Sequence, residues 1–198
     1  MRANVMAVGA GVAVAALGLA SEARAEVVLG ASLGAAVPIS AKGFDPGLTG
    51  DLRIGYQLPL KVIGVTVEAQ GGYTAFSPGS LPEQVSAGKV VRVTAGGRVS
   101  VGKLFEPYLA AHIGYGWVRQ SVTASDVLDL PGDLNGRGVT ADGRLGLQLN
   151  LMPVIRVGAD VGYSVLFGTK GAELGAETVG AKDALNWLTV GLNGALVF

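Results

Sequence analysis

A single histidine, His112, occurs in the 198-residue chain, and cysteine is absent. An imidazole titrates near neutral pH, so His112 is the first residue that could act as a general base. The lack of cysteine excludes thiol catalysis, disulfides and cysteine-based metal sites. Whether His112 can serve a reaction depends on where its segment places the ring and on which groups surround it.

Two other patterns suggest ligand binding. Asp126, Asp129 and Asp133 stand in one short segment, but they lack the alternate spacing and final glutamate of a calcium loop. The pairs Gly71-Gly72 and Gly96-Gly97 suggest phosphate loops, but no Lys-Ser or Lys-Thr follows either pair. We interpret the aspartates as surface-turn residues and the glycine pairs as bends or close contacts within strands. The sequence therefore predicts no metal and no cofactor.

The segments that carry these residues alternate apolar and polar side chains with a period of two, which is typical of strands with one apolar face. Eight such runs cover residues 27–37, 52–58, 63–74, 91–101, 109–117, 139–150, 155–167 and 188–198. Short turns at 59–61, 103–106 and 152–153 alternate with long loops at 39–50, 76–88, 118–137 and 168–184. This arrangement predicts an all-β fold, an eight-stranded antiparallel up-and-down transmembrane barrel.

The distribution of charged residues between the two faces of each run indicates which face of the barrel is outside. No charged residue stands on the apolar face of any run, whereas the opposite face carries many. A soluble lipocalin-like barrel would turn its apolar face inward, and a membrane barrel turns it toward lipid. We expect the polar face to line a packed lumen, with a charge network made of Asp51, Arg53, Glu68, Arg92, Arg98, His112, Asp142, Arg144, Arg156 and Asp160.

Aromatic residues are expected in two girdles at the membrane interfaces, where such rings gather. Toward the short turns the sequence offers Phe105, Tyr108 and Phe198. Toward the long loops it offers Tyr73, Phe76, Tyr115, Trp117 and Phe167.

The first 25 residues differ from the rest of the chain. Arg2 precedes an apolar stretch from Val5 to Ala20, and Ala23-Arg24-Ala25 forms a small-x-small site. This layout predicts a secretory signal peptide over residues 1–25, cleaved after Ala25 at a site that Ala23 helps to define. The barrel domain would then span residues 26–198.

The signal peptide, the eight runs and the terminal phenylalanine together resemble the OmpA/OmpX-type family of outer-membrane β-barrels of Gram-negative bacteria. The string FEPYLAAHIGYGW at 105–117 is similar to the fifth strand of that family. The resemblance implies a monomer in the cell outer membrane, surrounded by outer-membrane lipid and lipopolysaccharide. It also implies that the barrel-assembly machinery reads Leu192, Gly194, Leu196 and Phe198. We expect no cell-wall-binding domain after the barrel.

Three functions are weighed for this architecture. We favour a structural or surface-interaction role without catalysis, in which the strands carry loops whose ligand the sequence does not name. The alternative is a small channel of the OmpW kind for ions or apolar solutes. The third is a lipid A-modifying enzyme of the PagL type, which would need a serine two residues after the histidine, where Gly114 stands. The formal net charge of zero argues against nucleic acid as a partner.

Overall fold

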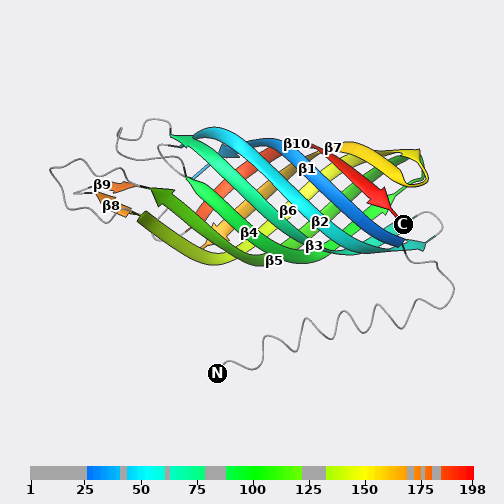
Figure 1. Ribbon diagram of the computed structural model, residues 1–198, viewed down its shortest axis with the longest axis horizontal. Helices are drawn as coiled ribbons and strands as arrows, with labels where there is room; N and C mark the ends of the chain where they lie inside the picture. Colours follow the sequence, from blue (N-terminus) through cyan, green and yellow to red (C-terminus); the bar gives the residue numbers. More distant parts are fainter. Residues whose placement is uncertain are drawn as a thin grey trace, which may run out of the picture.

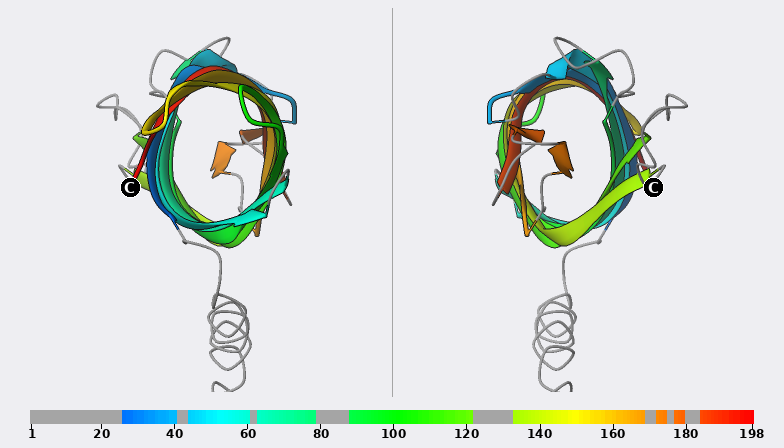
Figure 2. Two further views of the ribbon diagram at one scale, coloured as in Figure 1. Left: turned by 90° about the vertical axis from the view of Figure 1, so that its right-hand side faces the viewer. Right: turned by 90° about the vertical axis from the view of Figure 1, so that its left-hand side faces the viewer.

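The computed structural model describes residues 26–40, 44–60, 63–78, 88–121, 133–168, 172–174, 177–179 and 184–198. These residues form a closed antiparallel barrel with the strand order β1-β10-β7-β6-β5-β4-β3-β2 (Figure 1). The end-on views of Figure 2 show one ring of strands around the barrel axis. The eight-stranded up-and-down barrel predicted from the alternation is therefore confirmed.

The strands have the following bounds: β1 Glu26–Pro38, β2 Phe44–Leu60, β3 Ile63–Pro78, β4 Lys89–Val101, β5 Phe105–Ser121, β6 Asp133–Met152, β7 Ile155–Phe167, β8 Ala172–Leu174, β9 Glu177–Val179 and β10 Ala184–Val197. β8 and β9 pair only with each other, in a small hairpin within the segment predicted as the last long loop. Figure 1 shows this hairpin beyond the ends of the barrel strands.

Closure joins the first strand to the last. β1 and β10 pair antiparallel from Val28 opposite Val197 to Pro38 opposite Trp187. The backbone amide of Val27 donates to the carbonyl of Phe198 over 3.0 Å, and the amide of Phe198 donates back over 2.9 Å. Both ends of the barrel domain thus lie at the short-turn end, and the ring has no open edge.

Several strands are longer than the sequence predicts. β2 begins at Phe44, inside the segment 39–50 expected to be a loop, and β5 and β6 extend to Ser121 and from Asp133 into the segment 118–137. These extensions lack clean apolar alternation, so a periodicity criterion cannot detect them. The ladder of paired residues continues there, as in the pairing of Ser121 with Asp133.

The alternation of faces is confirmed, with two corrections among the aromatic residues. Phe76 and Tyr108 were expected in the lipid-facing girdles, but both side chains are buried inside the barrel. Strand parity explains the result, because Phe76 stands an odd number of residues from the outward-facing Tyr73, and Tyr108 from Phe105. The other girdle residues, including Trp117 and Phe198, are exposed on the outside.

No helical segment within the described part of the chain has the length and hydropathy of a membrane span. The predicted signal peptide, with Ala23 and Ala25, lies outside the described residues. So do Asp126 and Asp129, and nothing is described of the Asp133 side chain.

Glycine is required at particular places. Gly102 has φ 114° in the turn between β4 and β5, a left-handed conformation that other residues rarely adopt. Gly96 faces inward, where an added Cβ would collide with the Ala111 carbonyl oxygen of β5. Its neighbour Gly97 faces outward, and its nearest atom, the Thr66 carbonyl oxygen, would lie at an ordinary 3.6 Å. The close contacts expected of the glycine pairs are thus present on the inward face only.

The two neighbouring glycines of β4 provide a matched test of this packing. We expect Gly96→Val to lower the free energy of unfolding by about 1–3 kcal/mol, because the side chain would press the β4 and β5 backbones apart. Gly97→Val adds the same side chain to the open outer face and should unfold at the wild-type denaturant concentration. Urea titration of the refolded barrels measures both changes, and equal midpoints for the two variants would contradict the assignment of faces.

Candidate functional site

The barrel interior brings together the charged residues that the sequence singled out. Asp51, Arg53, Glu68, Arg92, Arg98, His112, Asp142, Arg144 and Asp160 are all buried. The tenth residue, Arg156, lies nearer the short turns with 12% of its side chain exposed. Nine of the ten side chains therefore lie on the inward, buried face of the barrel wall.

Asp51 of β2 is the centre of the upper part of the network, nearest the long loops. One of its oxygens accepts from Arg92 Nη2 at 2.5 Å, and the other accepts from Arg144 Nη2 at 2.7 Å. Arg92, which is fully buried, also donates to the Thr74 hydroxyl at 3.0 Å. One carboxylate therefore bridges two guanidinium groups, which come from β4 and β6.

His112 links the upper network to the middle of the lumen. Its Nδ1 lies 3.0 Å from Asp142 Oδ2, and its Nε2 lies 2.8 Å from Glu68 Oε1. Asp142 also faces Arg144 Nε at 3.7 Å, and Glu68 accepts from Arg98 Nη2 at 3.3 Å. The ion pairs thus form one continuous chain across β2 to β6, in the order Arg92, Asp51, Arg144, Asp142, His112, Glu68, Arg98.

A further hydrogen-bond cluster lies below this chain, and the sequence analysis missed it. The Tyr108 hydroxyl donates to Asp160 at 2.8 Å, and Asn193 donates to the same carboxylate oxygen at 2.8 Å. The Arg98 guanidinium stands 4.2 Å from the centroid of the Tyr108 ring, and Gln148 donates to Asn193 at 2.6 Å. The parity of Tyr108 relative to His112 was the signal that could have placed it inside.

Glu106 is a second residue that sequence reasoning missed, because it was assigned to a turn. The structure places it inside β5, where its carboxylate accepts from the Ser100 hydroxyl and from Asn150 Nδ2. Arg156 approaches Glu106 at 3.6 Å and donates to Gln57 at 2.6 Å. These contacts link β2, β4, β5, β6 and β7 across the lumen at the short-turn end.

Arg53 is buried but stands apart from the chain of ion pairs. Its Nε and Nη2 have no hydrogen-bond partner among the described residues. Gly30 of β1 makes room for this side chain, since an added Cβ there would collide with the guanidinium of Arg53. Arg53 is thus buried in the lumen, but none of the ion pairs formed among the described residues includes it.

An apolar cluster, which we call the cap, covers the charges at the loop end. Its buried members are Ala36, Phe76, Val90, Leu166, Leu185 and Trp187. Phe76 and Trp187 pack edge to face with ring centroids 5.9 Å apart, and the Arg92 guanidinium stands 5.6 Å from the Trp187 ring. The lumen is thus not polar throughout, as the sequence suggested, but sealed by hydrocarbon above its charged middle.

This arrangement leaves His112 without a catalytic geometry. Both ring nitrogens are engaged by carboxylates, so neither is left to take a proton from a nucleophile. The residue two positions on is Gly114, and its backbone packs against β4. Within the described residues, no group of three or more ligating side chains is arranged to hold a metal ion.

The exterior has the opposite character. Outward side chains in the middle of the barrel strands are apolar and exposed, with Leu52 at 70% and Leu192 at 72%. Aromatic rings border this belt, with Tyr115 and Trp117 in edge-to-face contact at 5.2 Å toward the loops and Phe105 and Phe198 toward the turns. A barrel that exposes hydrocarbon and buries its charges has a surface suited to lipid rather than to water.

Comparison with known proteins supports this conclusion at the level of the fold. No protein-family model matches the chain, and neither does any curated protein sequence. A major outer membrane protein from Thermus thermophilus superposes with a TM-score of 0.55 at 15% identity, covering 88% of this chain and 99% of that one. Neisserial surface protein A gives a TM-score of 0.54 at 14% identity, covering 88% and 97%.

Ail, the attachment invasion locus protein of Yersinia pestis, was solved in complex with the heparin analogue sucrose octasulfate. That structure has a TM-score of 0.54 at 15% identity and covers 88% of this chain and 99% of its own. Together with the inside-out distribution of charge, these likenesses define the class: the chain has the fold of the small eight-stranded outer-membrane β-barrels. The architecture implied by the OmpA/OmpX-type resemblance is confirmed.

Asp51 should be the most sensitive carboxylate of the lumen. We expect Asp51→Asn to lower the free energy of unfolding by about 3–5 kcal/mol, because it would leave two buried guanidinium groups without their shared counter-charge. Urea unfolding in lipid vesicles measures this change. Asp45→Asn, at an exposed position of the same strand, is the control and should leave the unfolding midpoint unchanged. An unaltered midpoint for Asp51→Asn would show that the chain of ion pairs contributes nothing to stability.

Proposed function

We propose that the protein is an integral outer-membrane β-barrel with a structural or surface-interaction role, a packed lumen and no catalytic activity. The observation that carries this proposal is the inversion of the usual protein surface. The outer wall exposes leucine, isoleucine and valine, while the charges that a water-soluble barrel would expose are paired inside. Such a wall is stable only in contact with lipid. The predicted signal peptide over residues 1–25 supports export to that membrane.

The lumen argues against a transport function. The cap buries aromatic and aliphatic side chains at one end, and the chain of ion pairs crosses the middle from β2 to β6. A channel of the OmpW kind needs a continuous path for ions or solutes. Opening one here would require the simultaneous breaking of buried ion pairs and the solvation of the cap. The ring of β-strands is therefore better suited to hold its loops in place than to conduct.

The surroundings of His112 likewise argue against a lipid A-modifying enzyme. Its ring is enclosed in the lumen between two carboxylates, away from the lipid-facing wall where a membrane lipid would approach. With Gly114 in place of a serine, the histidine has no hydroxyl partner two residues on. The contacts of this residue are those of a cation in a structural network.

A surface-interaction role is supported by the position of the loops. The strand ends that are joined by the long connections lie at the end of the barrel opposite to Glu26 and Phe198 (Figure 1). The Ail structure shows that a barrel of this fold is compatible with binding a sulfated heparin analogue. The ligand of the loops in this chain is not specified by its strands. A monomeric state, with outer-membrane lipid and lipopolysaccharide around the belt, remains our expectation.

The packed lumen should be tested by conductance. We expect the full-length protein, purified in detergent and inserted into planar lipid bilayers, to show no conductance steps or only very small ones. Heat-modifiable gel mobility of the same sample establishes that the barrel is folded. Frequent, stable open steps from a folded sample would contradict the proposed plug and favour the channel alternative.

We further propose that the last strand carries the signal for membrane assembly. Leu192 and Leu196 of β10 and the following Phe198 are exposed on the outside, and Gly194 lies opposite Ala31 of β1. The Phe198 ring is 67% exposed, so it adds little to the packing of the folded barrel. A free apolar C-terminal edge that later pairs with β1 would be accessible to the barrel-assembly machinery before closure.

Deletion of Phe198 should therefore reduce assembly more than it reduces stability. We expect several-fold less folded protein in the outer membrane, measured by fractionation and heat-modifiable mobility. Phe105→Ala removes another exposed aromatic ring at the same end and serves as the control, with near-normal assembly. Equal amounts of assembled protein for the deletion and the wild type would refute the assembly role.

A further inference from the structure

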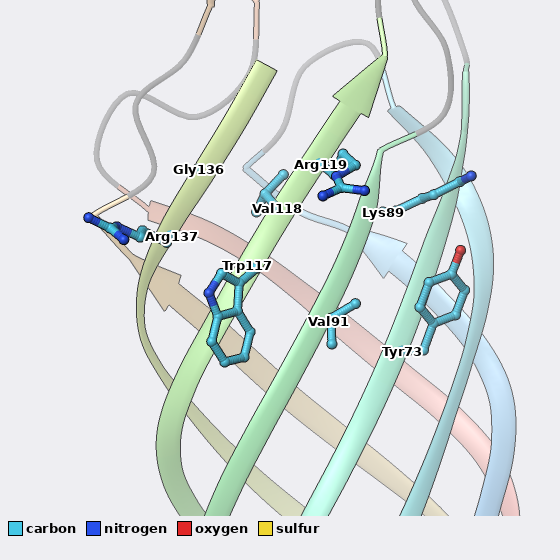
Figure 3. Close-up of a pocket in the computed structure, with 8 residues that line it drawn as sticks. All are labelled: Tyr73, Lys89, Val91, Trp117, Val118, Arg119, Gly136 and Arg137. Carbon is cyan, nitrogen blue, oxygen red and sulfur yellow. The ribbon is translucent and has the colours of Figure 1, made fainter. Parts of the chain in front are cut away.

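Three cations stand together on the outer wall of the barrel at its loop end. Lys89 of β4, Arg119 of β5 and Arg137 of β6 are exposed and belong to three neighbouring strands. Lys89 lies directly opposite Arg119, and Arg137 lies opposite Trp117, which faces outward two residues before Arg119. We call these three residues the basic rim. Figure 3 shows the basic rim above the rings of Tyr73 and Trp117.

Within the part of the chain that the structure describes, the basic rim lacks the charge pairing found in the lumen. Like charges at directly opposed strand positions destabilise a sheet, and Lys89 and Arg119 occupy such positions. None of the ion pairs formed among the described residues includes a member of the basic rim. An anion held between these side chains would relieve their repulsion. The fold therefore places a site for negative charge on the wall itself.

A hollow accompanies the basic rim. It measures about 680 Å³ and is lined by Tyr73, Lys89, Val91, Trp117, Val118, Arg119, Gly136 and Arg137 (Figure 3). A second hollow of about 550 Å³ shares Tyr73 and Val91 with the first and reaches over Gly71. A Cβ added at Gly71 would meet no atom within 4 Å, so this glycine leaves a groove in the wall. Leu52 and Val93 line the groove with hydrocarbon.

An anionic amphiphile needs positive charge beside its headgroup and an apolar surface beside its hydrocarbon chains. The basic rim and the groove at Gly71 provide these two features. Guanidinium groups bind phosphate oxygens through paired hydrogen bonds, and an ammonium group adds a point charge. Tyr73 and Trp117 mark the level at which headgroups meet acyl chains, because such rings gather at membrane interfaces. The basic rim lies directly on the loop side of that level. A phosphate there would leave its acyl chains beside the groove at Gly71.

The spread of the cations favours a headgroup with more than one phosphate. Neighbouring strands are about 4.8 Å apart, so the basic rim extends about 10 Å from β4 to β6. Two phosphates, one toward each end, match a row of this width and its three positive charges better than one phosphate does. We propose that the basic rim and the groove at Gly71 form a binding site for the diphosphorylated glycolipid of the outer leaflet, lipid A. This inference rests on the proposed outer-membrane location and names a specific lipid site within it.

The test compares lipid binding among variants of the full-length protein purified in detergent. Native mass spectrometry counts bound molecules of diphosphoryl lipid A, monophosphoryl lipid A and phosphatidylglycerol. We expect one diphosphoryl lipid A per wild-type barrel, with the two other lipids binding more weakly. Replacing Lys89, Arg119 and Arg137 by glutamine should weaken diphosphoryl lipid A binding at least about tenfold, a loss equivalent to about 1.4 kcal/mol.

Matched controls separate the site from general effects. Lys103→Gln removes an exposed cation at the turn end and should leave binding unchanged. Gly71→Leu should weaken binding by filling the groove, whereas Gly97→Leu adds the same side chain to the outer face elsewhere and should not. Binding of the soluble polyanion sucrose octasulfate is measured as well, to separate recognition of the lipid from attraction to negative charge alone. Wild-type affinity in the triple glutamine variant, or equal binding of phosphatidylglycerol or of the soluble polyanion, would overturn the proposal.

The location of the protein is measured separately, so that the two proposals fail independently. Membrane fractionation and heat-modifiable mobility are recorded for the wild type and every variant. Absence of the wild type from the outer membrane would refute the proposed function. A folded outer-membrane barrel that shows no preference for diphosphoryl lipid A would refute only the lipid site.

Discussion

A charge buried inside the barrel is costly unless groups on other strands compensate for it, and most of the lumen charges are compensated by ion pairs between strands. Asp51 illustrates the constraint, since its two oxygens bind Arg92 and Arg144 from β4 and β6. Contacts of this kind cross the lumen and fix the register of the strands between them. A shift of one residue would turn the charges toward lipid. The inward glycines follow from the same requirement, as Gly72 leaves space for Asp51 and Arg92.

The sequence was sufficient to predict the strands and their faces. A period of two is a local property, and eight repetitions of it with alternating short and long connections leave little choice of topology. The inward orientation of Arg98 or Asp142 follows from parity alone. The fold could therefore be predicted because, along each strand, the polarity of a residue indicates which side of the barrel wall its side chain faces.

The contents of the lumen were less predictable. Phe76 and Tyr108 were assigned by residue type to the membrane interface, although parity placed them inside. Glu106 was assigned to a turn because no periodicity marks the first residues of a strand. The partners themselves depend on strand tilt and stagger, which no local pattern encodes. For that reason the bridging of Glu68 and Asp142 by His112, and the isolation of Arg53, could be learned only from the closed barrel.

The cap of apolar side chains lies between the chain of ion pairs and the loop end of the barrel strands. Below it, a substitution must preserve a balance of charges that spans the chain of ion pairs. Phe76 and Trp187 pack on each other at the loop end, with the Arg92 guanidinium beside the Trp187 ring. We expect changes beyond the cap to leave that balance undisturbed, so that loops can be exchanged while the barrel persists. A barrel whose loops can be changed without disturbing its lumen is a suitable scaffold for the display of grafted peptides at a cell surface.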